Sequence, residues 1–300
     1  MIHWLLTADG IKTHDQQPLD TPFGRTLVHH GQVSTTGIVA VIVNHTQIWN
    51  YEQEHGWHQL VDVTDQNIQL NCLQWVNDKL LVGTSAARLA WVDDGELDFI
   101  VAFDKLEGRE QWNTPWGGPP DVRSLARTAD GILAADIHVG WIVTSVDGES
   151  WIARKKGLHK DVHHVTAHPS KDGIISCATA GGWYVSRNGG ESFDKYWDKS
   201  PTYQRTTAWF GDTDIILSSV SSGPSGYGAK LYRSEDWGKS WEEVEGLPEL
   251  EDNINTYQIT IDRDGRSYII ANNNSIYQSR DYGKTWKQIA EGLPKTYQIL

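Results

Sequence analysis

Cysteine is scarce in this sequence, with only Cys72 and Cys177 among 300 residues. Two cysteines about a hundred residues apart make neither a disulfide framework nor a zinc motif, and they fit a reducing compartment. We therefore expect a cytoplasmic protein.

Basic charge and long apolar runs are also lacking. The 26 Lys and Arg residues face 39 Asp and Glu residues, for a net charge of −13, whereas a phosphate backbone calls for a basic surface. No stretch reaches the ~18–20 apolar residues of a membrane span, and the N-terminus does not read as a signal peptide. We therefore expect neither nucleic acid nor membrane as a partner. No linker or low-complexity tract divides the chain, which predicts a single domain over residues 1–300.

Tryptophan, by contrast, is abundant, and several of the 15 residues end a repeated motif. Segments 234–241 and 279–286 read S-x-D-x-G-x-x-W, segment 186–193 has Asn and Phe at the Asp and Trp positions, and segment 145–151 is one residue shorter. A short polar side chain in such a motif caps its own turn, and glycine permits a positive φ. We therefore predict a structural role for the capping residues Asp147, Asn188, Asp236 and Asp281.

The spacing of the motif predicts the architecture. Copies recur every 41 to 48 residues, which is the period of a propeller blade, and four short strands surround each copy. Degenerate copies at 91–95, 48–57 and 7–10 extend the count to seven. Residues 296–299 repeat the inner-strand sequence at 256–259. We therefore predict an all-β, seven-bladed β-propeller with four-stranded blades, closed by the C-terminal strand joining the first blade, which removes exposed sheet edges.

The four motif copies resemble the Asp-box, or BNR, repeats of a group that includes sialidases, related glycosidases and the plant and cyanobacterial photosystem II assembly factor. Segments 83–89, 108–124 and 138–140 look most like a bacterial subfamily often labelled BNR repeat or sialidase-like, which implies a fold but no reaction. Sialidases also share an arginine triad, a Tyr/Glu nucleophile pair and an early F/Y-R-I-P segment, which residues 23–26 do not match. A shared fold does not transfer chemistry.

Ligands of propellers usually bind at the mouth of the central channel, where the inner strands begin. Counting back from the turn after the inner strand predicts one equivalent polar position in four blades, and alignment of 161–163 with 121–123 and of Lys295 with Asn255 adds two more. These residues are Asn71, Arg123, His163, Arg205, Asn255 and Lys295. Converging cations in a partly desolvated funnel suit a carboxylate, phosphate or sulfate. The alternative is a polar channel wall that holds water.

Three further residues are candidates for ligand binding. Asp121 precedes Arg123 by two positions, Trp116 lies in the Trp/Pro/Gly loop 112–120 that leads to it, and Arg88 is the third. The loop either forms the wall of a pocket or fills the channel.

His138 and His163 are the predicted acid–base residues because histidine titrates near neutrality. A divalent metal held by these two and an acid such as Asp121 or Glu110 is an alternative. Structural histidines are the default, so no metal or cofactor is predicted.

Three functions stay open at this point. The first is a channel-mouth site for a small anionic or sugar-like ligand, with or without catalysis. The second is a non-catalytic scaffold that holds a protein partner on one face. The third is an exo-sialidase-type glycosidase, which needs two carboxylates about 5 Å apart or a Tyr/Glu pair beside three arginines. The sequence does not decide whether the protein is an enzyme.

Overall fold

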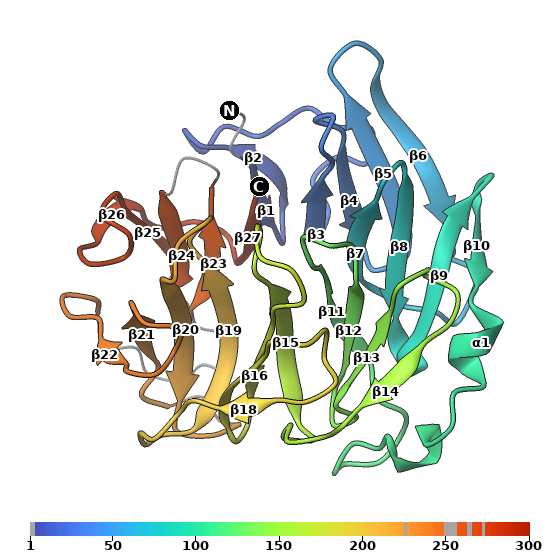
Figure 1. Ribbon diagram of the computed structural model, residues 1–300. Helices are drawn as coiled ribbons and strands as arrows, with labels where there is room; N and C mark the ends of the chain where they lie inside the picture. The colour runs from blue at the N-terminus through green and yellow to red at the C-terminus, as the bar shows by residue number, and fades with distance from the viewer. Residues whose placement is uncertain (1–3, 225–226, 249–256, 263–265, 272–273) are drawn as a thin grey trace.

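Seven antiparallel sheets surround a central axis in the computed structural model, which describes residues 4–224, 227–248, 257–262, 266–271 and 274–300 (Figure 1). Six sheets are meanders of four consecutive strands that run from the axis outward. Short connections of this kind join antiparallel strands, because a parallel return needs a crossover of a dozen or more residues.

The bounds of these six blades are given from the inner to the outer strand. They are β3 (Val28–Val33), β4 (Val39–Val43), β5 (Gln47–Glu52) and β6 (Gly56–Asp62); β7 (Leu70–Val76), β8 (Lys79–Thr84), β9 (Arg88–Asp93) and β10 (Glu96–Phe99); β11 (Val122–Arg127), β12 (Leu133–Ile137), β13 (Ile142–Ser145) and β14 (Ile152–Arg154); β15 (Val162–Ala167), β16 (Ile175–Thr179), β17 (Gly182–Ser186) and β18 (Asp194–Lys195); β19 (Tyr203–Trp209), β20 (Ile216–Ser221), β21 (Lys230–Ser234) and β22 (Glu242–Glu243); and β23 (Gln258–Ile261), β24 (Ser267–Ala271), β25 (Ser275–Ser279) and β26 (Lys287–Ala290). The described helical segments are short: α1 (Val101–Asp104) and single 3₁₀ turns at Ser85–Ala87 and Arg109–Gln111.

The seventh blade joins the two ends of the chain. Its inner strand is β27 (Thr296–Ile299), which pairs with β1 (Trp4–Thr7), and β1 pairs with β2 (Gly10–Thr13). The seven inner strands contact one another in sequence, and β27 contacts both β23 and β3. The predicted closure by the C-terminal strand is therefore confirmed. This blade has three described strands, and a single bridge between Lys12 and Pro18 takes the place of the fourth.

The apolar core lies between the blades. Seven clusters of described residues each combine side chains from two neighbouring blades. Tryptophan fills several of these layers: Trp183 of β17 packs edge-on against Trp209 of β19 and against Trp241. Burying such rings supplies the large contact area that holds each blade against the next.

The Asp-box residues hold the turns between the third and fourth strands. Asp236 Oδ1 accepts a hydrogen bond from the hydroxyl of Ser234 at 2.9 Å and from the N–H of Ser240 at 2.8 Å, and the Trp241 indole N–H donates to a carbonyl of the preceding blade. The contacts from the serine hydroxyl and the backbone N–H recur at Asp147, Asn188 and Asp281.

One degenerate copy of the motif occupies a different turn from the others. Residues 7–10 connect β1 to β2, which are the second and third strands of their blade. The box-like turn of that blade follows β2 instead, where the Thr13 hydroxyl donates to the carboxylate of Asp15. The count of seven blades is unaffected, because it rests on the sheets themselves.

No helix in the described part of the chain is long and apolar enough to cross a membrane.

Candidate functional site

A β-bulge near the start of the inner strands builds the channel mouth. The pairing register shifts by one residue at equivalent places in six inner strands: β3, β7, β11, β15, β19 and β27. Such a bulge re-aims a side chain out of the alternating pattern of the strand. The residues at the slip are His29, Asn71, Arg123, His163, Arg205 and Tyr297.

Buried polar groups on the second strand support two of these bulges. Asp136 Oδ1 accepts the backbone N–H groups of Arg123 at 3.0 Å and Ser124 at 2.5 Å. In β20 the hydroxyl of Ser219 accepts the N–H of Thr206, next to Arg205. Burial raises the pKa of Asp136 to about 7, although these hydrogen bonds oppose the shift.

Four of the six predicted ring residues therefore occupy equivalent places: Asn71, Arg123, His163 and Arg205. Asn255 lies outside the described residues. Lys295 immediately precedes β27, and its carbonyl accepts the N–H of Ala8 just as the carbonyl of Asp121 accepts the N–H of His138. Lys295 is thus equivalent to Asp121, and Tyr297 holds the bulge of that strand.

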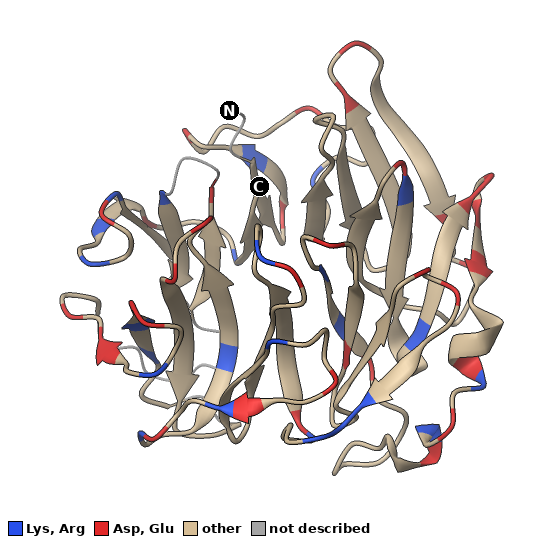
Figure 2. Ribbon diagram, viewed as in Figure 1, with Lys and Arg blue, Asp and Glu red and all other residues tan. Residues whose placement is uncertain are grey.

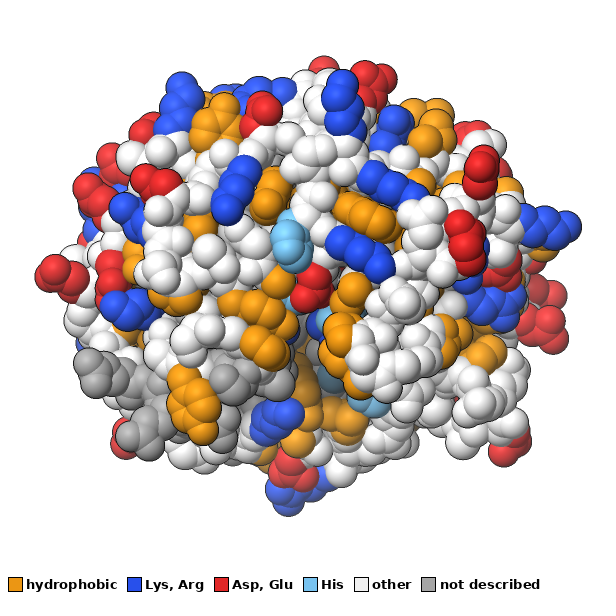
Figure 3. Space-filling view, turned by 90° about the horizontal axis from the view of Figure 1, so that it is seen from below, with side chains coloured by type: hydrophobic (Ala, Val, Ile, Leu, Met, Phe, Trp, Pro, Cys, Tyr) orange, Lys and Arg blue, Asp and Glu red, His pale blue; other side chains and the backbone are white. Residues whose placement is uncertain are grey.

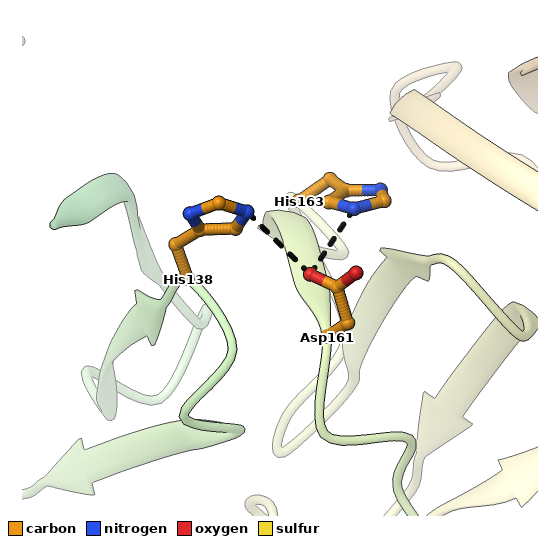
Figure 4. A group of neighbouring side chains, drawn as sticks. All are labelled: His138, Asp161 and His163. Carbon is orange, nitrogen blue, oxygen red and sulfur yellow. Dashed lines mark ion pairs between the residues drawn. The ribbon is translucent and has the colours of Figure 1, made fainter. Parts of the chain in front are cut away.

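The centre of the site is a carboxylate between two imidazoles (Figure 4). Asp161 Oδ1 lies 3.2 Å from Nε2 of His163 and 3.6 Å from Nε2 of His138. His138 follows β12, whereas Asp161 and His163 stand at the start of β15 in the next blade, so two blades contribute. These ligand-type atoms all lie within 4.8 Å of one another.

Burial and charge determine the protonation of this group. Desolvation lowers the pKa of His138 to about 4, with the positive charge of Arg123 acting in the same direction and Asp161 opposing it. Desolvation alone would raise the pKa of Asp161, but its interactions with His163 and His138 outweigh burial and lower that pKa. His138 is therefore a neutral imidazole and Asp161 a carboxylate near neutral pH.

Two arginines flank this centre. Arg123 is exposed, whereas Arg205 is 8% exposed and its guanidinium stacks on the ring of Tyr203, 4.6 Å from the centroid. Burial lowers the pKa of Arg205 and raises that of Tyr203. No residue in the described part of the chain accepts a hydrogen bond from the Nε of Arg205. The Tyr203 ring also packs on His163, at 4.5 Å between centroids.

The loop before β11 covers one side of the mouth. Trp116 is 71% exposed, and its ring lies 5.3 Å from that of His138. Trp112 of the same loop turns inward and packs on Phe103 in the core. The loop therefore forms a wall beside the site. Asp121, which ends the loop, hydrogen-bonds the backbone of Ala86, and burial raises its pKa against the opposing effect of Arg123.

Arg88 does not join the site. Its guanidinium donates to Asp104 at 2.6 Å and lies over Phe99 of the outer strand β10. The three arginines proposed from the sequence as ligand-binding residues therefore do not converge, unlike the arginine triad of a sialidase. Glu110 belongs to a 3₁₀ turn on the way to the loop, and the carboxylate next to both histidines is Asp161.

Sequence reasoning missed four residues of this mouth: Asp161, Tyr203, His29 and Tyr297. The repeat did hold a signal for the first, because the tripeptide at 161–163 matches that at 121–123 and places Asp161 level with Asp121. His29 was not expected because no inner strand was recognised in the first 30 residues, although β3 begins at Val28.

The face on which β11, β15 and β19 begin is hollowed at its centre, where histidine, acidic and basic side chains meet apolar ones (Figure 3). Elsewhere on the molecule charges are spread along the loops and strand ends (Figure 2). Recesses of about 490 and 380 Å³ have Trp75 and Tyr257, respectively, among their lining residues, and neither includes a residue of the His138 cluster. The channel mouth is therefore distinguished by the charged and titratable side chains that meet there, and not by the volume that it encloses.

Comparison with known proteins identifies the repeat. The family model of the BNR-Asp box repeat matches residues 231–244 and 276–289. These matches contain the boxes of Asp236 and Asp281. No curated protein sequence matches the chain.

Solved structures share the fold at low sequence identity. Virginiamycin B lyase from Staphylococcus aureus aligns with a TM-score of 0.65 at 9% identity, over 89% of this chain and 85% of that one. YCF48 from Cyanidioschyzon merolae aligns with a TM-score of 0.60 at 16% identity, over 89% of this chain and 87% of that one. The GH74 enzyme of Niastella koreensis aligns with a TM-score of 0.61 at 14% identity, over 87% of this chain. This chain spans only 45% of the length of that enzyme and 24% of the length of an ancestral GH74 enzyme. At such identities the likeness concerns the fold alone.

Proposed function

We propose that this seven-bladed propeller of Asp-box repeats binds a small anionic ligand, such as a carboxylate, a phosphate or a sugar acid, at its channel mouth. The observation that carries the proposal is the state of Arg205, a buried guanidinium whose Nε has no hydrogen-bond partner among the described residues. A buried donor without an acceptor costs free energy, and a charged one costs more. An anion in the mouth would supply the missing acceptor.

The second arginine supports the same class of ligand. Arg123 stands on the equivalent bulge of the blade two places before Arg205, and its charge reaches both His138 and Tyr203. Planar guanidinium groups bind carboxylates and phosphates in bidentate geometry. A cationic pair in a chain of net charge −13 favours a specific anion over general surface attraction.

Trp116 and Tyr203 add apolar faces to this cationic mouth. Trp116 exposes most of its ring beside His138, and Tyr203 packs on His163. Pockets for small molecules typically combine aromatic walls with a few fixed polar groups. A ligand with a carbon skeleton behind its acidic group, such as a sugar acid, would use both.

In the metal-free protein, any reaction on the ligand would use His138 as the base. Its low pKa keeps the imidazole neutral and able to accept a proton, and the neighbouring arginines would stabilise a developing anion. Ligand binding is the primary proposal, and catalysis is its extension.

The test is ligand binding by the wild type and three matched variants. Thermal shift and calorimetry with phosphate, sulfate, citrate and glucuronate should reveal at least one ligand, because binding to the native state raises stability by about 2.7 kcal/mol at a hundredfold excess over Kd. Arg205→Met and Arg123→Met keep an apolar stem but lose the guanidinium. Each should weaken binding by roughly tenfold or more, the scale of one charge-assisted hydrogen bond.

Arg127→Met is the control, because Arg127 is exposed at the far end of the same strand, β11. Equal binding by all variants would place the anion elsewhere. If no compound binds the folded wild type, the proposal fails and a protein-binding scaffold becomes the better reading. Turnover of a fluorogenic sialoside by the wild type would instead favour the glycosidase alternative.

A further inference from the structure

We propose that His138, Asp161 and His163 bind one divalent transition-metal ion at the channel mouth. The proposal extends the anion site described above but does not depend on it, because the metal has ligands of its own. It rests on hydrogen-bond direction, on ligand geometry and on the rigidity of the surrounding backbone.

The tautomer of His163 is fixed by its neighbour. Nδ1 lies 2.5 Å from the carbonyl oxygen of Gln204. A carbonyl only accepts hydrogen bonds, so Nδ1 must carry the proton. In the neutral imidazole, Nε2 then presents its lone pair to the site. The side chain of His163 is 1% exposed, so water does not compensate for this lone pair.

That lone pair faces another acceptor. Nε2 of His163 is 3.2 Å from Oδ1 of Asp161, and neither atom has a hydrogen-bond donor in the described part of the chain. Two acceptors held in contact repel each other unless a cation lies between them. The cation is either an additional proton on His163 or a metal ion, and the position of His138 favours the metal.

His138 completes a three-ligand set. Its Nε2 is 3.6 Å from the same carboxylate oxygen, and the three ligand atoms lie within 4.8 Å of one another. Ligands about 2.0–2.2 Å from a zinc ion in a tetrahedral or octahedral arrangement are roughly 3–3.5 Å apart. Only small side-chain shifts would be needed. Two imidazoles and one carboxylate suit zinc or iron(II) and leave coordination positions open.

The surrounding backbone holds all three ligands in place. The carbonyl of Gln204 orients His163, as second-shell carbonyls do for metal-bound histidines. The backbone carbonyl of Asp161 accepts the N–H of Ala180, and the N–H of His138 donates to Asp121. Figure 4 shows the two imidazoles directed at the carboxylate from opposite sides. The site is therefore organised before any ion arrives.

The neighbouring charges explain why a metal and an anion belong together here. One carboxylate neutralises half of the charge of a divalent ion, and Arg123 and Arg205 add positive charge nearby. A loaded site would therefore favour a dianion that binds the open metal positions and the guanidinium groups together. This deepens the proposed function by making the ligand a metal-bridging one.

The experiment measures metal binding without any other ligand. Protein stripped with a chelator is titrated with Zn²⁺ against a chromophoric competitor, and with Co²⁺ by visible absorption. We expect one equivalent of Zn²⁺ to bind and Co²⁺ to give ligand-field bands. His163→Gln, His138→Gln and Asp161→Asn should each lower the affinity by roughly 100-fold or more, exceeding the 10- to 100-fold effect of a second-shell change.

His14→Gln is the control, since His14 is exposed in the blade that joins the chain ends. Stoichiometric binding that persists unchanged in the three ligand variants would overturn the proposal, as would absence of binding by the wild type. If His163→Gln fails to fold because the bond to Gln204 is lost, His138→Gln and the Co²⁺ spectrum decide alone. Anion binding by chelator-treated protein tests the proposed function separately.

Discussion

Asp136 lies directly behind Arg123: its buried Oδ1 accepts the Arg123 N–H at 3.0 Å and the N–H of the next residue at 2.5 Å. One carboxylate oxygen thus satisfies both donors that the bulge removes from the strand ladder. Ser219 serves Thr206 in the same way beside Arg205. The orientation of the two arginines therefore depends on buried side chains one strand away from the channel.

This relationship predicts a difference between two substitutions. Asp136→Ser keeps a small acceptor like that of Ser219, whereas Asp136→Ala leaves two buried N–H groups without one. The alanine variant should be less stable than the serine variant by about 1–3 kcal/mol. Urea unfolding of both measures the difference, and equal midpoints would show that the bulge does not need the acceptor.

Two tryptophans of one loop should respond oppositely to truncation. Trp112 is 6% exposed within the core, so Trp112→Ala should cost about 3–5 kcal/mol of stability. Trp116 is 71% exposed, so Trp116→Ala should change stability by no more than about 0.5 kcal/mol. Thermal unfolding tests both. A large loss in the Trp116 variant would mean that this ring supports the loop rather than the site.

The ionisation of Asp147 should account for part of the stability that the protein loses at acidic pH. Hydrogen bonds from the N–H groups of Ser150 and Glu149 lower its pKa to about 2, below its ordinary value near 4. A depressed pKa gives stability that is present above the ordinary value and lost as the pH falls towards the folded value. This contribution should therefore disappear between about pH 4 and pH 2.

Asn188 shows that an amide can fill the same position in another box. Between pH 5 and pH 2, the Asp147→Asn variant should accordingly lose less stability than the wild type. The Asp147→Ala variant should be less stable than the wild type at every pH in this range. Melting temperatures across this range measure the comparison. Parallel curves for the wild type and the asparagine variant would contradict the predicted contribution.

The ring closure predicts the effect of removing its last strand. Deletion of residues 296–300 would leave β1 with an unpaired edge, so we expect a lower melting temperature and concentration-dependent association, measured by light scattering. The side chain of Gln298 also bonds the N–H and C=O of Gly31 on β3. Gln298→Ala should therefore cost about 1–3 kcal/mol without exposing an edge.

Gln288→Ala is the control for that substitution, because Gln288 is exposed on the outer strand β26. A monomeric truncated protein with unchanged melting temperature would mean that closure by β27 contributes little.

The motif spacing alone predicted the blades, because each Asp box encodes its turn locally. Asp236 and Asp281 bind groups within four residues, so neighbouring sequence is sufficient to recognise them. The ring closure could be predicted for a similar reason, because residues 296–299 repeat the sequence of a whole strand at 256–259. Counting along the repeat also placed Arg123, His163 and Arg205 at equivalent positions.

Only the tertiary structure decided which of these side chains meet. Asp161 joins two histidines because neighbouring blades bring the end of one hairpin beside the start of the next inner strand, which no local pattern encodes. The assignment of Lys295 was wrong because it rested on a sequence alignment with Asn255, whereas the bulge of that strand holds Tyr297. Sequence period determined the propeller and the channel. The packing of one blade against another determined the His138–Asp161–His163 centre, because contacts between blades depend on register and side-chain direction in three dimensions.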